Sequence, residues 1–290
     1  MFGLHTGDTM TTEVFRLIRD CIYDYCGIHF DEGSRYLLEK RLARRLGALG
    51  IPTFHEYYLY LNSFRSRDQE FMDIMDILTT NETYFFRESA QLKAFSEEVI
   101  PELINRKRQR GDRTLRIWSA GCSTGEEAYT IAMLLRANRE LAGWNVEIFG
   151  TDISQRVLEQ ARRAVYGKAS FRVTDEACIR QYFAEQDGGL RVCDGIRSQV
   201  TFSRLNLYDL DRSRMPGRMD VIFCRNVIIY FDLAAKKRVV ESFHGSLVEG
   251  GFLLLGHSET LMNVTTLFTL RHFKNDMIYQ KPEISERRLP

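Results

Sequence analysis

The chain has 290 residues, of which 44% are hydrophobic and 27% are charged, and its formal net charge at pH 7 is +1. This composition is typical of a folded globular protein, and the length suits one large domain or two modest ones. A net charge so close to zero excludes a protein that is basic or acidic overall. No apolar run approaches the roughly 20 residues that span a bilayer, and the start, MFGLHTGDTMTTEVF, lacks the pattern of a secretory signal. We therefore expect a cytoplasmic protein without membrane insertion.

The first part of the chain, from residue 11 to about 79, has the texture of helices. EVFRLIRDCIYDYCGI carries apolar residues at near-helical spacing, and SRYLLEKRLARRLGALG follows with Ser34 as a candidate N-cap and Gly50 as a stop. FHEYYLYL and DQEFMDIMDIL are two shorter amphipathic segments. The pattern predicts an all-helical N-terminal region.

The texture changes at about residue 113, after the charged stretch PELINRKRQRGDR, which is either a helix end or a linker. Short apolar runs rich in β-branched and aromatic residues follow, separated in several places by helical patterns such as EEAYTIAMLLRANREL. Strands of this kind alternating with helices predict a parallel sheet covered on both faces. The predicted strands are TLRIWSAG, NVEIFGTD, QVTFSRLN, MDVIFCRN and GGFLLLGHS.

The loop after the first predicted strand is SAGCSTGEEAY, residues 119–129. In open α/β sheets ligands bind where such a loop meets a helix N-terminus. The spacing G-x-x-x-G matches neither the dinucleotide fingerprint nor the Walker pattern. Glu126 and Glu127 would repel a pyrophosphate but suit a ligand that carries a positive charge. Taken alone, the loop is equally compatible with a glycine turn followed by helix-capping acids.

Asp152 ends the second predicted strand, about thirty residues after the glycine loop. An acid at this place can accept hydrogen bonds from ribose hydroxyls, or it can simply cap the next helix. A nucleoside with a cationic group and no phosphates describes S-adenosylmethionine. Asp152 alone would also allow NAD.

Six motifs point to a family. NETYFFRE, WSAGCSTGEEAY, GTDIS, NLYD, IFCRNVIIYFD and GHSE resemble, in order and spacing, the chemotaxis receptor glutamate methyltransferases of the CheR family. The resemblance implies an α/β fold: a Rossmann-like class I methyltransferase domain with a small antiparallel β subdomain insert, preceded by an all-helical N-terminal domain. We place the helical domain at residues 1–90, the methyltransferase domain at 91–290 and the inserted subdomain at 165–199.

The resemblance also implies a set of site residues. Arg87 and Tyr230 match the active-site arginine and tyrosine of the family, and Arg87 also matches a cofactor contact. The segment ILTTNETYFFRE would form the entry wall of the cofactor site, with its aromatic residues anchored in the core. The cofactor contacts would be Asn81, Thr83, Arg87, Glu127, Asp152, Asn206, Leu207, Asn226 and Val227.

The second predicted helix carries a basic face. From Arg35 to Arg45 there are five basic residues and one acid, a local charge of +4. A solvated charged face is one interpretation, and a docking face for an acidic surface is the other. No aromatic residues interleave for nucleic-acid stacking, and the family reading favours the Glu-rich helices of a receptor. The docking residues would be Lys40, Arg41, Arg44 and Arg45.

The cysteines and histidines show no metal-binding pattern. There is no CxxC, and no histidine stands at a ligand spacing beside a cysteine. We expect reduced thiols and no metal ion. The cysteines are Cys21, Cys26, Cys122, Cys178, Cys193 and Cys224.

We therefore expect an S-adenosylmethionine-dependent enzyme that methylates glutamates of chemoreceptors for sensory adaptation and releases S-adenosylhomocysteine. A methyltransferase for RNA or a small molecule and a non-catalytic module that senses the cofactor are the alternatives. We expect a monomer. The insert's turn FAEQDGGLRV is short, so we also expect little backbone for an edge that a receptor C-terminal peptide could join, and hence no tethering.

Overall fold

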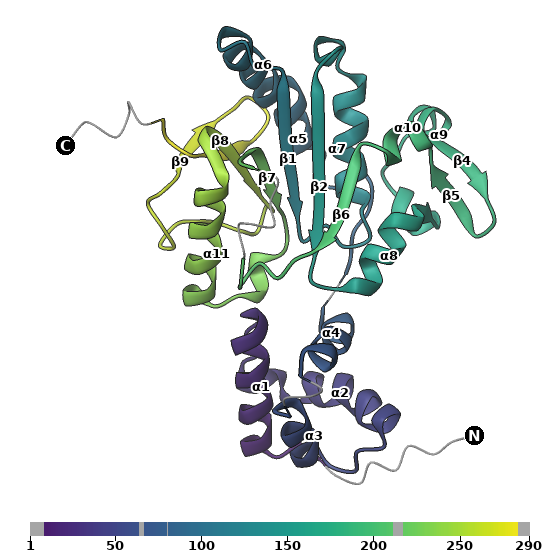
Figure 1. The fold of residues 1–290 in the computed structure, drawn as a ribbon, viewed down its shortest axis with the longest axis vertical. Helices are drawn as coiled ribbons and strands as arrows, with labels where there is room; N and C mark the ends of the chain where they lie inside the picture. Colours follow the sequence, from purple (N-terminus) through teal and green to yellow (C-terminus); the bar gives the residue numbers. More distant parts are fainter. Residues whose placement is uncertain (1–8, 64–66, 80, 211–216, 284–290) are drawn as a thin grey trace.

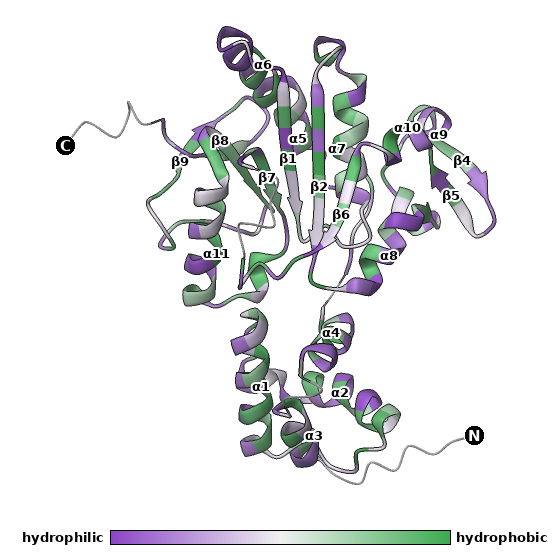
Figure 2. Cartoon of the chain, in the orientation of Figure 1, coloured by the Kyte–Doolittle hydropathy of each residue, from purple (hydrophilic) through white to green (hydrophobic). Residues whose placement is uncertain are grey.

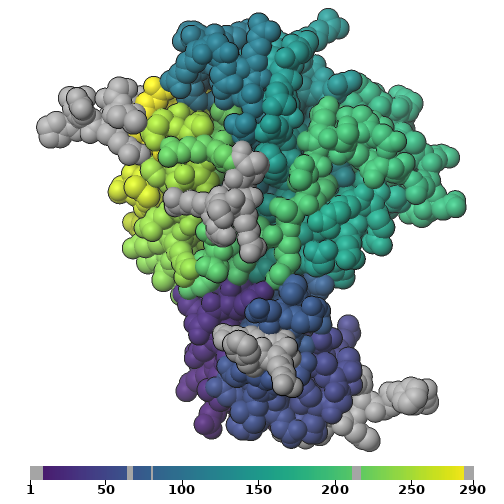
Figure 3. Space-filling model, in the orientation of Figure 1, coloured from purple at the N-terminus to yellow at the C-terminus, as the bar shows by residue number. Residues whose placement is uncertain are grey.

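The structure is a computed structural model that describes residues 9–63, 67–79, 81–210 and 217–283. It has a helical N-terminal domain packed against the lower edge of a larger α/β domain (Figure 1). No helix in these described ranges is long and apolar enough to cross a membrane. Figure 3 shows the two domains in direct contact.

The helical domain consists of α1 (Thr12–Cys26), α2 (Arg35–Leu49), α3 (Phe54–Leu61) and α4 (Arg67–Leu78). Their apolar faces turn toward one another (Figure 2) and bury a core that includes Phe15, Leu42 and Phe71. Gly50 ends α2 in the left-handed conformation, as predicted. Ser34 does not cap α2 with its side chain: a 3-10 turn, η1 (Glu32–Ser34), precedes the helix, and Asp31 caps that turn.

A second group of helices leads into the sheet: α5 (Ser89–Ala94), the π-turn η2 (Phe95–Val99) and α6 (Ile100–Gln109). The charged stretch PELINRKRQRGDR is therefore mainly the end of a helix rather than a linker. Its apolar residues Leu103 and Ile104 are fully buried in the core beside the sheet, whereas the basic residues Arg106, Lys107 and Arg108 lie in the last turn of the helix.

The sheet has seven strands in the order β6-β2-β1-β7-β8-β10-β9. The first five of these are mutually parallel, and β10 pairs antiparallel with both β8 and β9. Strand order therefore runs in opposite directions on the two sides of β1, which creates a switch point there. The strands are β1 (Thr114–Ala120), β2 (Asn145–Asp152), β6 (Val200–Arg204), β7 (Met219–Cys224), β8 (Leu247–Leu255), β9 (Thr269–His272) and β10 (Met277–Gln280).

Helices cover both faces of the sheet because alternate residues of each strand are buried on opposite sides. On β1, Ile117 joins the core that α6 and α7 (Glu126–Ala137) cover. Trp118 belongs to the opposite core and packs edge-on against Phe243 of α11 (Leu233–Ser246), with ring centroids 5.3 Å apart. The remaining large helix, α8 (Gln155–Arg163), follows β2.

A small subdomain is inserted between α8 and β6. Its antiparallel sheet has three strands in the order β3-β5-β4, and the turn between β4 and β5 is tight because Gln186 pairs with Gly189. Its elements are β3 (Val165–Tyr166), η4 (Lys168–Phe171), α9 (Glu176–Tyr182), β4 (Phe183–Gln186), β5 (Gly189–Val192) and α10 (Asp194–Arg197). The predicted fold class, with its inserted antiparallel sheet and helical N-terminal domain, is confirmed. β3 and β4 lie at the two edges of this sheet, and β4 has four residues.

Candidate functional site

A cavity lies at the carboxyl ends of β1, β2, β6 and β7, beside the switch point of the sheet. The structure brings all ten of the predicted cofactor-binding and catalytic residues to its walls. They are Asn81, Thr83, Arg87, Glu127, Asp152, Asn206, Leu207, Asn226, Val227 and Tyr230. The helical domain supplies further wall residues that the sequence did not predict, among them Cys26 and Ile28.

The glycine loop forms one wall through its backbone. Gly121 has φ of 77° and donates its N–H to the Thr151 carbonyl at 2.7 Å. A Cβ at this position would lie 2.4 Å from a methyl group of Val227, so only glycine fits between the ends of β1 and β7. Ser123 is also left-handed, with φ of 49°. These turns bring main-chain groups close to the cavity.

Asp152 is held in place by two backbone amides. Its carboxylate oxygens accept hydrogen bonds from Ser123 N at 2.9 Å and Ser154 N at 3.0 Å. Each oxygen keeps a lone pair for a ligand hydroxyl. Asp152 does not cap α8; Ser154 does, by accepting from Val157 N. Burial raises the pKa of Asp152, and the backbone hydrogen bonds oppose that rise.

The two glutamates after the glycine loop point to different places. Glu127 lines the cavity and accepts a 2.6 Å hydrogen bond from the Ser119 hydroxyl. Glu126 is 2% exposed and accepts hydrogen bonds from Thr124 and from Ser170 of the insert. Of these two glutamates, only Glu127 therefore offers its carboxylate to a cationic ligand. Burial raises its pKa, and the nearby Arg225 guanidinium lowers it.

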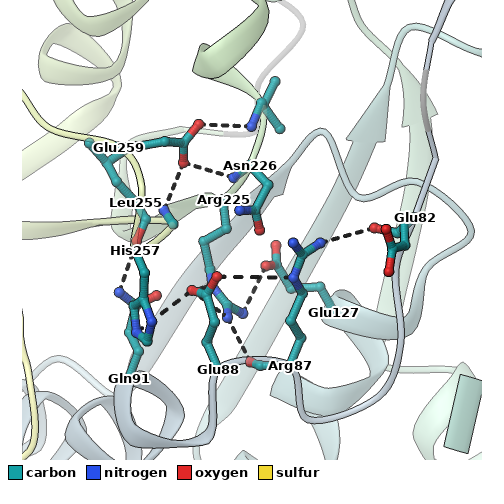
Figure 4. A network of polar contacts seen from close by, with 12 residues as sticks. Glu82, Arg87, Glu88, Gln91, Glu127, Arg225, Asn226, Leu255, His257 and Glu259 are labelled. Atoms are coloured by element: carbon teal, nitrogen blue, oxygen red, sulfur yellow. Dashed lines mark hydrogen bonds and ion pairs between the residues drawn. The ribbon is translucent and has the colours of Figure 1, made fainter. Parts of the chain in front are cut away.

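Arg225, at the end of β7, joins three parts of the site (Figure 4). It is 7% exposed. Its Nη1 lies 3.2 Å from Glu127, and its Nη2 lies 3.0 Å from Glu88 and donates to the Arg87 carbonyl at 2.6 Å. A buried guanidinium with these partners is satisfied. Arg225 therefore fixes the distance between the entry segment, residues 81–88, and helix α7, which follows the glycine loop.

The aromatic residues of the entry segment anchor it to the core, as expected. Phe85 is fully buried, and its ring packs against Phe171 and Phe183 of the insert and against Tyr166. Its backbone N–H donates to the Ser170 carbonyl at 2.9 Å. The segment is therefore fixed at its middle, on the insert.

Arg87 follows this anchor and lines the cavity. Its neighbours Phe86 and Glu88 are both left-handed, with φ of 58° and 57°, a conformation that costs about 1 to 2 kcal/mol for each non-glycine residue. The Arg87 Nη1 donates to the Glu82 carbonyl at 3.0 Å, and its Nε lies 4.0 Å from Glu88. The guanidinium is thus held near the entrance rather than in a tight surface ion pair.

Asn206 connects the cavity to the helical domain. Its side-chain nitrogen donates to the Tyr25 carbonyl at 2.6 Å, and its oxygen accepts from Tyr208 N at 3.1 Å. The side-chain amide is therefore engaged within the protein. Further hydrogen bonds cross the same junction, among them those from Tyr23 to Asp232 and from Ser154 to Asp76.

The loop after β7 forms the opposite wall. Asn226 is left-handed, with φ of 60°, and no group of the described residues hydrogen-bonds to its buried Oδ1. This acceptor, together with Glu127 and Asp152 in the same cavity, fits a ligand that carries hydroxyl and ammonium donors. Tyr230 is 36% exposed, and its carbonyl accepts from His29 N at 2.9 Å. This set of acceptors suits S-adenosylmethionine.

The predicted docking residues are not equivalent. Lys40 and Arg44 are exposed on α2. Arg41 donates to the Leu78 carbonyl at the end of α4, and Arg45 pairs with Glu70 and Asp73 of that helix. The basic face is therefore divided: Arg41 and Arg45 hold α2 to α4, and Lys40 and Arg44 point to solvent. Sequence periodicity places the four predicted docking residues on one side of α2, but it does not show that α4 packs against part of that side.

Cysteines and acids do not gather into a metal-binding group. In residues 9–63, 67–79, 81–210 and 217–283 no three His, Cys, Asp or Glu side chains lie where they could hold an ion together. None of the six cysteines forms a disulfide bond within the described residues.

Comparison with known proteins identifies the family. Residues 13–79 match the model described as CheR methyltransferase, all-alpha domain, and residues 81–276 match CheR methyltransferase, SAM binding domain. The chain is 36% identical over 275 residues to chemotaxis protein methyltransferase 2 of Vibrio cholerae, covering 94% of each chain. It is 35% identical over 261 residues to the chemotaxis protein methyltransferase of Escherichia coli, covering 89% of this chain and 87% of that one. The chain belongs to the CheR family of chemotaxis methyltransferases, which are S-adenosylmethionine-dependent.

Proposed function

We propose that the protein transfers a methyl group from S-adenosylmethionine to glutamate side chains of chemoreceptors in the cytoplasm, giving glutamyl methyl esters and S-adenosylhomocysteine for sensory adaptation. One observation carries the proposal. Arg87 and Tyr230, from segments 143 positions apart in the sequence numbering, line the same cavity as the carboxylates of Glu127 and Asp152. The Arg87 guanidinium therefore lies at the entrance of a site whose interior carries the carboxylates of Glu127 and Asp152.

The protein's task in this reaction is mainly positioning. A glutamate with an ordinary pKa near 4.3 is ionised at pH 7, so its oxygen needs no general base. Arg87 can bind that carboxylate through its guanidinium, and Tyr230 can direct its hydroxyl to the same place. When bound, S-adenosylmethionine supplies the methyl group on a sulfonium. Alignment of this kind is worth roughly 7 to 11 kcal/mol of the barrier.

The residues proposed to hold the cofactor have distinct tasks. Asp152 would accept from ribose hydroxyls, Glu127 would attract the positive charge, and Asn226 Oδ1 would accept from a donor. Asn206 would act through its backbone, because Tyr25 and Tyr208 occupy its side-chain amide. Asn81, Thr83, Leu207 and Val227 line the remaining wall.

The proposed partner is the Glu-rich helical region of a chemoreceptor, approached through Lys40 and Arg44, with the enzyme acting as a monomer and without nucleic acid. We also propose that no receptor C-terminal peptide is needed. The shortness of β4, which has four residues, supports this proposal. Alternate residues of an edge strand point their backbone groups outward, so about two residues could pair with an added peptide.

The test uses methyl-labelled S-adenosylmethionine with the purified protein and a membrane fraction from its own source. Mild alkali should release the label from a receptor-sized band as methanol, because methyl esters are base-labile. Label that survives alkali, or that enters RNA or a small molecule, would support the alternative methyltransferase instead. Cofactor binding without turnover would leave only a sensing module.

A further inference from the structure

The carboxylate of Glu259, in the turn after β8, accepts four backbone hydrogen bonds. Oε2 accepts from Asn226 N at 2.7 Å and from Gly256 N at 2.7 Å. Oε1 accepts from Val227 N at 2.9 Å and from Ile229 N at 3.2 Å. Figure 4 shows the carboxylate turned toward Asn226. Three of the four donors thus belong to the loop that follows β7.

This loop forms a wall of the cavity, whereas Glu259 is not among the described residues that line it. Asn226, Val227 and Tyr230 face the cavity, and the N–H groups of the loop point away from it, to Glu259. A carboxylate can accept at all four places because both of its oxygens are acceptors with no hydrogen of their own. Glu259 therefore lies behind the wall and fixes its main chain.

The loop needs such support because its conformation is unfavourable. Asn226 is left-handed, with φ of 60°, which a non-glycine residue adopts at a cost. The turn after β8 is pressed against it: a Cβ on Gly256 would lie 2.8 Å from Asn226 Nδ2 and 2.9 Å from Glu259 Oε2. Gly256 thus permits the close approach that lets one carboxylate reach both loops.

We propose that Glu259 is a positioning residue of the methyltransferase site: its carboxylate holds the loop of residues 226–230 so that Asn226, Val227 and Tyr230 face the cofactor and the methyl acceptor. The inference rests on the proposed function for the meaning of these side chains. The loop geometry itself does not depend on that function. A residue that only stabilised the fold would not act selectively on these amides.

The first test is Glu259→Gln, which keeps the size of the side chain. Glutamine offers one carbonyl oxygen, and its NH₂ group would face donors that already point inward. In the ligand-free full chain, the amides of Asn226, Val227, Ile229 and Gly256 should exchange with deuterium at least about tenfold faster. Amides inside β1 and β7 should keep their protection.

The affinity for S-adenosylhomocysteine, measured by calorimetry, should fall about tenfold, which corresponds to about 1.4 kcal/mol. Turnover should fall further, because Tyr230 is displaced as well. Glu259→Asp, which keeps the charge on a shorter arm, should restore part of both. The wild-type titration separates the two claims: if the wild type does not bind S-adenosylhomocysteine, the proposed function fails, and amide exchange still tests Glu259.

Glu98→Gln is the matched control. Glu98 also holds a distant loop through backbone amides, accepting from Lys274 N at 2.7 Å and Asn275 N at 3.1 Å, and it does not line the cavity. Glu98→Gln should lower the melting temperature about as much as Glu259→Gln does. It should leave turnover and the affinity for S-adenosylhomocysteine near wild type.

Gly256→Ala reaches the same loop with Glu259 intact, and it serves if Glu259→Gln does not fold. Its added methyl group should push Asn226 away and produce the same loss of affinity. Unchanged amide protection and affinity in Glu259→Gln or Gly256→Ala would overturn the proposal. So would a uniform loss of protection across β1 and β7, because that would indicate a general structural role.

Discussion

The guanidinium of Arg45 lies 2.6 Å from a carboxylate oxygen of Glu70, whose side chain is 1% exposed. Glu70 also accepts a 2.6 Å hydrogen bond from the hydroxyl of the fully buried Tyr57. Three helices of the N-terminal domain thus meet at one buried acid. This relationship removes Arg45 from the surface that a receptor could contact.

Arg45→Ala should destabilise the protein by about 3 kcal/mol, because it leaves the Glu70 carboxylate buried without its cation. Urea unfolding followed by circular dichroism measures the loss. Arg44→Ala, on the same helix but exposed, should change the unfolding free energy by less than about 0.5 kcal/mol. Equal effects of the two substitutions would contradict the structural role of Arg45.

The double reversal Lys40→Glu, Arg44→Glu should strongly reduce methylation of receptor-containing membranes and leave the affinity for S-adenosylhomocysteine unchanged. The reason is that both side chains are exposed on α2 and neither lines the cavity. The wild-type rate should also fall with added salt, as steering is screened. Arg136→Glu, Arg139→Glu, with Arg136 in the last turn of α7 and Arg139 just after the helix, is the matched control. An equal loss there, or a rate independent of salt, would argue against docking through α2.

Binding of S-adenosylhomocysteine should weaken as the pH falls below neutral. Burial raises the pKa of Asp152 above 3.8 and that of Glu127 above 4.5, so both carboxylates take up protons at a higher pH than exposed acids do. A protonated Asp152 loses an acceptor for a ribose hydroxyl. Asp152→Asn should raise the dissociation constant at pH 7 about tenfold or more and flatten its pH dependence. A steep dependence that persists in Asp152→Asn and Glu127→Gln would assign the titration to other groups.

The raised pKa values of Asp152 and Glu127 also affect the free energy of unfolding. Because the folded-state pKa values are raised, ionised Asp152 and Glu127 cost stability at neutral pH without ligand, and that cost disappears as the pH falls through the raised values.

Arg87→Ala should reduce turnover about ten- to a hundredfold, the equivalent of one charge-assisted hydrogen bond, and shift the melting temperature little. Among the described residues its side chain donates one hydrogen bond, to the Glu82 carbonyl, and its Nε lies 4.0 Å from Glu88, so folding does not depend on it heavily. Arg87→Lys should recover only part of the rate, since lysine lacks the planar fork. Near wild-type activity of Arg87→Ala would remove Arg87 from the reaction.

A peptide corresponding to the last five residues of a receptor should not bind at micromolar concentration. The edge strand β4 is four residues long and turns at once into β5, so little backbone is available for an added strand. Calorimetric titration of the peptide is the direct measurement. Micromolar binding, or a methylation rate that collapses when the receptor tail is deleted, would show that a tether raises the effective concentration of substrate.

Much of the fold could be predicted because its signals are local. The parallel strands follow from continuous apolar runs, and Asp152 follows from its place at a strand end. The pairing of Arg45 could not be predicted, because Glu70 lies 25 residues away on another helix. The different directions of Glu126 and Glu127 depend on Ser170 of the insert. Glu259 belongs to the motif GHSE, but three of the four amides that converge on it lie 30 to 33 positions earlier in the chain, so the motif alone does not predict them.

The helical domain contributes Cys26 and Ile28 to the cavity, and Ile28 pairs with Phe231 across the junction. A ligand in this cavity therefore touches both domains at once. Thermodynamic linkage makes the two effects equal. If contact between the domains raises the affinity for the ligand by some factor, then the bound ligand raises the affinity of the domains for each other by the same factor. If the two domains were produced as separate chains, S-adenosylhomocysteine would promote their association.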